Sequence, residues 1–175
     1  MVTLDMVHSY FGYQKKVMMS LQEVKDEQKE TDGNPEIKRK IRAAQMAASR
    51  QRIQLDVPSA TVIITNPTHY SVALKYTEHV DKAPKIIAMG KNNLAAEIRL
   101  TAIKHAIPIY EAPELARAIY FTGKVGSYII DDLYMAVAIV LSYIAQLKNY
   151  QIGLGNKPDY VNDLQVPKQY HFDKK

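Results

Sequence analysis

Cysteine is absent from this chain of 175 residues. Disulfide bonds, thiolate catalysis and cysteine-ligated metal sites are therefore excluded. Long apolar segments are also missing, because the longest run, from Leu133 to Leu141, has nine residues, whereas a membrane-spanning helix needs about 20. The first residues, MVTLDMVHSYFGYQKK, lack the continuous apolar stretch of a signal peptide. We therefore expect a soluble chain, which could still be one piece of a larger membrane protein.

Signature motifs of several enzyme classes are missing as well. The sequence has no GxxxxGK run, no GxGxxG after a strand and no HExxH, so nucleotide-binding loops and a zincin site are not predicted. Histidines occur without the spacing of metal ligands, at positions 8, 69, 79, 105 and 171. His69 and Ser71 are two residues apart, but no oxyanion loop accompanies them, which disfavours a hydrolase triad. We therefore expect no metal ion and no cofactor.

The positive charge is concentrated in one segment. The formal net charge is +5, and six cations but no acid fall between Lys38 and Arg52. Such a helix face suits anionic lipid, nucleic acid or an acidic protein partner, and a plain solvated face is an equal alternative. Nucleic acid is the weakest of these, because the segment lacks interleaved aromatic residues and any known reading module. If this face binds a partner, we expect an acidic protein or a membrane surface.

The middle of the chain has the pattern of a small α/β fold. Short β-branched or alternating runs predict four strands, at residues 60–65, 70–76, 84–90 and 107–112. Apolar periodicity predicts helices at residues 91–106, 112–123 and 131–150. The helix between the third and fourth strands favours a parallel, right-handed crossover. The predicted fold class is thus α/β, with a small four-stranded mixed sheet surrounded by about four helices.

A long N-terminal helical arm is expected before this domain and a tail after it. Residues 1–56 contain few large apolar side chains and two helix patterns, at 4–30 and 35–55, so we predict an extended, partly mobile linker arm. Residues 57–150 form the predicted α/β domain. Residues 151–175 contain Gly, Pro and charge without periodicity, which predicts a flexible C-terminal tail.

An Asn-Pro pair lies between the first two predicted strands, in the sequence TNPTHYS. Asn followed by Pro is typical of a β-turn, and the same pair at Asn34-Pro35 begins a predicted helix, so the dipeptide alone is weak evidence. Its chemistry is more restrictive. Proline has no N–H, so the usual attack of the next backbone nitrogen on the Asn66 side chain is excluded. The Asn66 side-chain nitrogen can still attack its own backbone carbonyl, which forms a succinimide and cuts the chain before Pro67.

Such self-cleavage depends on local geometry. It requires a strained turn, donors for the developing oxyanion and a proton source for the departing Pro67 nitrogen. Histidine is the side-chain type suited to proton transfer near neutral pH, and His69 is the one close to the bond. A structural role for His69 in the turn is equally compatible. The reaction would be one intramolecular event, so the chain would not be a turnover enzyme.

Several segments resemble one protein family. NPTHYSVALKY (66–76), preceded by DVPSATVIITN (56–66) and followed by EAPELARAIY (111–120), resembles the cytoplasmic domain of the flagellar export switch protein, in the FlhB/YscU family of type III secretion systems. EVKDEQKETDGNPEIKRKIR (23–42) resembles the linker arm of the flagellar branch of that family. The resemblance covers nearly the whole chain except the tail.

The resemblance implies a component of a protein-export gate. Family members have an N-terminal membrane domain of four helices, so this chain would be the cytoplasmic domain of a bacterial inner-membrane protein, with a membrane-proximal arm. Members cleave themselves within NPTH, which maps the cut to Asn66 and Pro67 and gives Thr68 and His69 positioning and tuning roles. Cleavage is tied to the switch of export from rod and hook subunits to filament subunits. The implied partners are the hook-length control protein, other export-gate components and exported flagellar subunits.

Two further expectations follow from the residues themselves. The strands on either side of the bond belong to one sheet, so the two halves of a cleaved chain should stay together. As an alternative function, NPTH could be an inert turn in a non-catalytic protein-binding domain whose basic arm docks on a partner.

Overall fold

The structure is a computed structural model that describes residues 35–161 and 164–172. The chain divides into two compact units, residues 1–46 and 47–175. In the first unit the described part is the exposed beginning of helix α3, which runs from Pro35 to Asp56. Proline is well suited to the first helical position, because the first N–H groups of a helix have no partner within it. The predicted helix at residues 4–30 lies outside the described residues.

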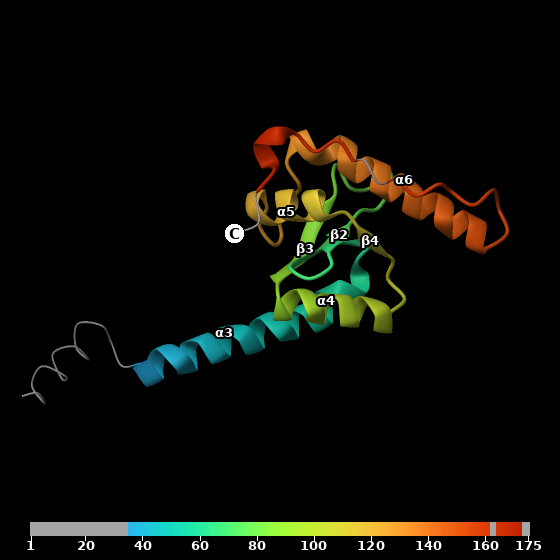
Figure 1. The fold of residues 1–175 in the computed structure, drawn as a ribbon. Helices are drawn as coiled ribbons and strands as arrows, with labels where there is room; N and C mark the ends of the chain where they lie inside the picture. The colour runs from blue at the N-terminus through green and yellow to red at the C-terminus, as the bar shows by residue number, and fades with distance from the viewer. Residues whose placement is uncertain (1–34, 162–163, 173–175) are drawn as a thin grey trace, which may run out of the picture. The chain divides into compact units, whose positions relative to one another are not determined.

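A four-stranded sheet forms the centre of the second unit (Figure 1). Its strands are β1 (Val62–Asn66), β2 (Tyr70–Lys75), β3 (Lys85–Lys91) and β4 (Ile109–Glu111), and their order in the sheet is β3-β2-β1-β4. β2 is antiparallel to both β1 and β3, whereas β4 is parallel to β1. The predicted mixed sheet is therefore confirmed. β3 and β4 run in the same direction, as the predicted crossover requires, but β4 pairs with β1 and is not a neighbour of β3.

Helices cover both faces of this sheet (Figure 1). Helices α5 (Pro113–Thr122) and α6 (Tyr134–Gln151) cover one face, and α4 (Asn93–Lys104) with the last turns of α3 covers the other. The alternation of side chains along β1 follows this arrangement. Val62 and Ile64 belong to the core beneath α5 and α6, Ile63 belongs to the core beneath α4, and all three are fully buried. β1 is thus an interior strand, enclosed on both faces and paired at both edges.

The predicted helices of the domain are confirmed with small shifts at their ends. The pattern at 91–106 forms α4 and that at 112–123 forms α5. The pattern at 131–150 begins with a single 3₁₀ turn, η2 (Asp131–Leu133), before α6 starts. At the end of α3, Ile53 is 3% exposed and the Gln54 side-chain amide donates to the Thr101 hydroxyl of α4 at 3.1 Å. In the described ranges no helix has both the length and the apolar character needed to cross a membrane.

The segment after α6 packs back onto the domain, although its sequence has no periodicity. The ring of Tyr160 stacks on that of Tyr110 in β4, with a centroid distance of 4.6 Å and an interplanar angle of 16°. The Tyr160 hydroxyl donates to the Glu111 carbonyl at 2.6 Å. Further along, Leu164 and Val166 join the core beneath α5 and α6. The sequence did not indicate these contacts, and the predicted division into arm, domain and flexible tail stays a prediction.

Candidate functional site

The NPTH sequence forms a tight turn between β1 and β2. Asn66 is the last residue of β1 and Tyr70 is the first of β2, and the two residues pair across the strands. The backbone N–H of His69 donates to the Asn66 carbonyl oxygen at 3.0 Å. This bond closes a four-residue β-turn that has Asn first and Pro second, as the sequence predicts. The carbonyl at the Asn66-Pro67 bond is therefore already a hydrogen-bond acceptor.

Asn66 is buried, unlike the other three residues of the turn. Asn66 is 7% exposed, whereas Pro67, Thr68 and His69 are exposed. Paired residues of antiparallel strands share one face of the sheet, so the Asn66 side chain lies on the same face as Tyr70, beneath α5. Among the residues that the structure describes, no hydrogen bond holds the Asn66 side-chain amide. The amide therefore has no such bond to break before it turns toward its own backbone carbonyl.

The start of α4 holds the far side of the turn. The Asn92 N–H donates to the His69 carbonyl oxygen at 2.8 Å. Asn92 directly precedes α4 and has a φ of 51° with a ψ of −111°, a combination outside the left-handed helical region. Both backbone groups of His69 are thus bonded, the carbonyl to Asn92 and the N–H to Asn66. These bonds restrict the direction in which the His69 N–H can point.

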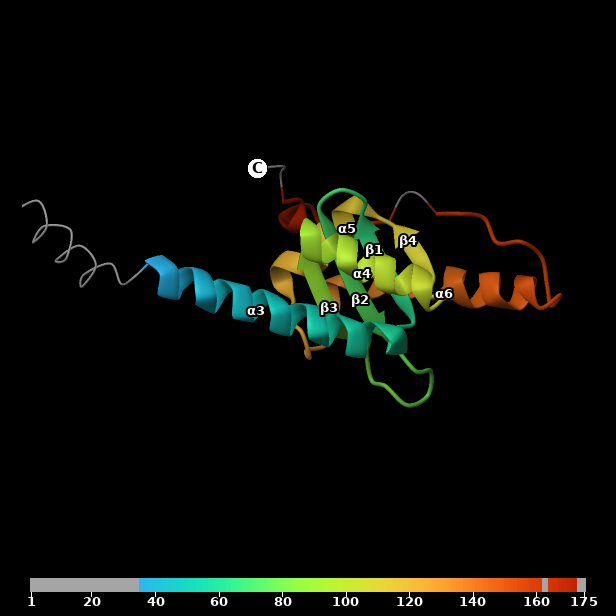
Figure 2. The same ribbon diagram turned by 90° about the horizontal axis from the view of Figure 1, so that it is seen from below.

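Aromatic rings from three segments pack beside the turn. The ring of Tyr70 lies 4.7 Å from that of Tyr120 and 5.5 Å from that of Phe121, both in α5, measured between centroids. Phe172, near the C-terminus, lies 4.7 Å from Phe121, and Figure 2 shows this segment at the same end of the sheet as the turn. The exposed His69 ring is 6.3 Å from the Tyr70 ring and has no hydrogen bond within the described residues. Its predicted role in proton transfer stays a prediction.

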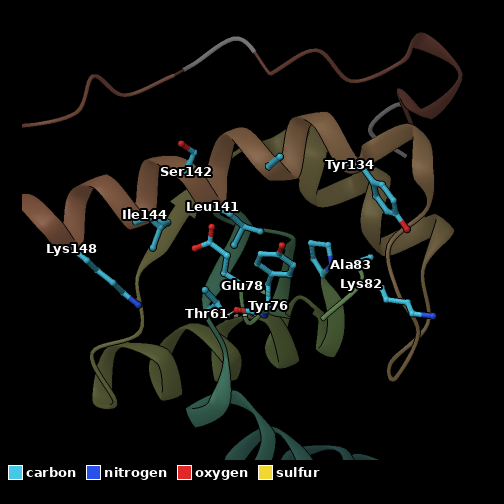
Figure 3. A pocket seen from close by; sticks show the side chains of 13 residues that line it. Thr61, Tyr76, Glu78, Lys82, Ala83, Tyr134, Leu141, Ser142, Ile144 and Lys148 are labelled. Atoms are coloured by element: carbon cyan, nitrogen blue, oxygen red, sulfur yellow. Dashed lines mark hydrogen bonds between the residues drawn. The ribbon is translucent and has the colours of Figure 1, made fainter. Parts of the chain in front are cut away.

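A groove of about 540 Å³ lies at the other end of β2, between α6 and the loop that follows the strand. Figure 3 shows Leu141 and Ile144 of α6 pointing into the groove, where Glu78 and Tyr76 lie, with Lys82 and Lys148 at opposite ends. This groove was not predicted from the sequence. A signal was present, since α6 is apolar around more of its circumference than one buried face requires.

Metal binding finds no support in the geometry of the described ranges. They contain no group of three or more His, Asp or Glu side chains that could hold an ion. Two histidines lie near a single carboxylate each, His79 at 3.8 Å from Glu78 and His171 at 3.6 Å from Glu114. One histidine with one carboxylate falls short of the three or four protein ligands that zinc sites have.

Comparisons with known proteins agree with one another. The model of the FlhB HrpN YscU SpaS family matches residues 1–144. The flagellar biosynthetic protein FlhB of Salmonella typhimurium is 45% identical over 172 residues, which are 98% of this chain and 45% of that protein. The crystal structure of the cytoplasmic domain of FlhB from Shewanella putrefaciens is 41% identical, with a TM-score of 0.66, and the match covers 70% of this chain and 95% of that one.

A more distant solved structure is the EscU C-terminal domain with an asparagine replaced by alanine. It is 31% identical, with a TM-score of 0.50, and the match covers 51% of this chain and 90% of that one. A second structure of the same domain has a proline replaced by alanine, with the same identity and TM-score. The chain thus matches nearly the full length of the solved domains but spans under half the length of the FlhB relatives of known sequence.

Proposed function

The chain belongs to the FlhB HrpN YscU SpaS family, and from this membership we propose that it is the cytoplasmic part of a flagellar protein-export component that cuts its own backbone between Asn66 and Pro67. The cut switches export from rod and hook subunits to filament subunits. The complete protein is anchored in the bacterial inner membrane. Its partners are the hook-length control protein, other components of the export gate and the exported subunits.

The proposed reaction is an intramolecular displacement at the Asn66 backbone carbonyl. The side-chain amide nitrogen of Asn66 attacks the carbonyl carbon and loses one proton. A tetrahedral centre with an oxyanion forms, and its collapse expels the Pro67 nitrogen, which takes up a proton and becomes a secondary amine. The products are a C-terminal succinimide on the first 66 residues and a new N-terminus at Pro67, and water later opens the ring. Atoms and charge balance in the cleavage step without an added reactant, and the later opening of the ring consumes one water.

One observation carries the proposal, the 3.0 Å hydrogen bond from the His69 N–H to the Asn66 carbonyl oxygen. A preorganised donor at this oxygen stabilises the oxyanion that forms there, and removing one such donor from an enzyme costs about 10²- to 10³-fold in rate. The reaction is also intramolecular, which removes part of the entropic barrier. Thr68 sets the length and direction of the turn, and the exposed His69 ring supplies the proton to Pro67.

The position of the cut favours a change of conformation over release of a fragment. β1 belongs to the first fragment and lies between β2 and β4, both of which belong to the second. Eight residue pairs join β1 to these neighbours, five with β2 and three with β4. The fragments therefore stay associated while residues 67–69 gain freedom. The export partners would then recognise the altered surface at the turn.

Intact mass and denaturing electrophoresis test the reaction. The wild-type chain should separate into fragments of 66 and 109 residues (175 less 66), and Asn66→Ala should stay intact because it has no nucleophile. The pair Asn34-Pro35 is an internal control, since its proline is the first residue of α3 instead of the second residue of a hairpin turn, and no cut is expected there. A wild-type chain that keeps one intact mass after days at neutral pH would refute self-cleavage.

The alternative, a non-covalent binding domain with an inert turn, is favoured by the groove between α6 and the loop after β2. Its lining is mainly apolar, with the Glu78 carboxylate near the middle and a lysine at each end, which suits a short apolar segment with an acidic residue near each of its ends. The two functions can be separated by the same variant. If the wild-type chain stays intact, and Asn66→Ala changes neither its mass nor its binding of export partners, the turn is inert and the alternative is correct.

A further inference from the structure

A chain of hydrogen bonds runs behind the turn, on the face of the sheet that α4 covers. The Arg99 Nη1 of α4 lies 3.1 Å from the Ser71 Oγ. The Ser71 Oγ lies 3.1 Å from the Thr65 Oγ1, and the Thr65 Oγ1 lies 3.0 Å from the Tyr70 carbonyl oxygen. We call these four groups the Arg99 relay.

The direction of every bond in the Arg99 relay follows from the number of protons available. The Tyr70 carbonyl can only accept, so the single hydroxyl proton of Thr65 points to it. The Thr65 Oγ1 therefore accepts from the Ser71 hydroxyl, and the Ser71 oxygen accepts from the guanidinium of Arg99. Bonds aligned in one direction and started by a cation polarise one another. Thr65 is 3% exposed and Ser71 is fully buried, so water does not compete for these bonds.

Residues of the Arg99 relay flank the turn on both strands. Thr65 directly precedes Asn66, and Tyr70 and Ser71 directly follow the turn. Sliding or rotation of β1 against β2 at this end of the pair would break the bond between Thr65 and Tyr70. The same helix also holds the His69 carbonyl through the Asn92 N–H. α4 therefore supports the turn at two points, one at its start and one near its middle.

We propose that the Arg99 relay holds the Asn66 carbonyl in the orientation required for self-cleavage. Thr65, Ser71 and Arg99 are then positioning residues for the reaction, outside the NPTH sequence. This proposal rests on the function proposed above and adds to it the part of the fold that aims the reacting carbonyl. The attack depends on the angle between the amide nitrogen and the carbonyl, and a misplacement of about 1 Å can lower a rate by about 10²-fold.

The hairpin contains a matched control at its opposite end. The Thr61 Oγ1 lies 3.0 Å from the Tyr76 carbonyl oxygen and accepts from the Tyr76 N–H at 2.9 Å. Thr61 directly precedes β1 and Tyr76 directly follows β2, so this threonine joins the same two strands away from the turn. Replacing either threonine by valine removes a hydroxyl and keeps the side-chain shape. A general loss of stability therefore affects both variants, whereas a loss of positioning affects one.

The experiment measures the cleavage rate of the whole chain. Each variant is made by cell-free synthesis with a short labelling pulse, and the cleaved fraction is followed by denaturing electrophoresis. We expect Thr65→Val to cleave about 10- to 100-fold more slowly than wild type. We expect Thr65→Ser, which keeps the hydroxyl, to cleave within about threefold of wild type, and Thr61→Val to cleave at the wild-type rate. Unfolding midpoints of both valine variants, each combined with Asn66→Ala, should be lowered, that of Thr65→Val by more because the Thr65 hydroxyl is buried and that of Thr61 is only part-buried.

The possible outcomes separate this proposal from the proposed function. If wild type does not cleave, self-cleavage is refuted and positioning is refuted with it. If wild type cleaves and Thr65→Val cleaves as fast, only the Arg99 relay is refuted. Equal slowing of Thr65→Val and Thr61→Val would also overturn the proposal, because it would show that general stability controls the rate. Slowing of Thr65→Val alone, with recovery in Thr65→Ser, supports it.

Discussion

After self-cleavage, the two fragments should stay bound through β1, and a single core substitution in that strand should weaken their binding strongly. Ile64 is fully buried beneath α5 and α6, in the fragment that ends at Asn66. Replacing a buried isoleucine by alanine costs about 2–5 kcal/mol, because apolar contacts are lost and a cavity remains. At about 1.4 kcal/mol per tenfold, Ile64→Ala should raise the dissociation constant of the fragments from about 30-fold to several thousandfold.

The assay compares the cleaved fractions of wild type, Ile64→Ala and Leu55→Ala over a dilution series, by size-exclusion chromatography and native mass spectrometry. Leu55 lies in the same fragment but is 70% exposed, so its replacement tests for loss of side-chain mass without loss of buried contacts. Wild type and Leu55→Ala should elute as one complex at micromolar concentration. Separate wild-type fragments under these conditions, or equal dissociation constants for the two alanine variants, would refute the argument that burial of β1 retains the fragment.

Two further predictions concern the tail and α4. Burial is the main cause that raises the pKa of both Tyr110 and Tyr160 above 10.0. As the pH rises, the unfolded chain therefore loses these protons before the folded chain does, so the stabilisation by the stacked pair is complete below pH 10 and decreases above it. Unfolding measured in an Asn66→Ala background should show this decrease in stability, and the decrease should be smaller in Tyr160→Phe. A Cβ on Gly90 would lie 2.7 Å from the backbone carbonyl carbon of Leu94, so Gly90→Ala should lower the free energy of unfolding by about 1–3 kcal/mol, and an unchanged denaturation midpoint would contradict the close approach of β3 and α4.

Local patterns were sufficient to predict the elements of the fold. β-branched or alternating runs identified β1 to β3 within about two residues, and the run at 107–112 identified the three-residue β4. The order of strands was harder to predict, because it depends on which edge β4 joins, and the sequence around Ile109 contains nothing that selects β1 over β3. The stack of Tyr160 on Tyr110 was also missed. It is a contact between distant residues, formed by a segment that has no periodicity.

For the candidate site, too, some residues could be predicted from the sequence and others could not. Asn66 and Pro67 were identified from chemistry that depends only on their being adjacent in the chain. The bond from the His69 N–H follows from the turn type, and it was within reach of sequence reasoning. The role of Arg99 could not be predicted in this way, because its contact with Ser71 joins residues 28 positions apart. No local pattern distinguishes this arginine from others on a helix surface, so only the packing of α4 against the sheet reveals it.

The interior position of β1 also determines how the cleaved chain would respond to a mechanical force. β1 follows α3 and the 3₁₀ turn η1 (Val57–Ser59), so tension applied to the chain before it pulls the strand along its own length. The hydrogen bonds to β2 and β4 lie across that direction and are strained together, in shear, instead of opening one at a time. In the uncut chain the turn passes the same tension on to β2. The cut removes this path, and from then on only the contacts of β1 with its two neighbouring strands resist its removal from the sheet.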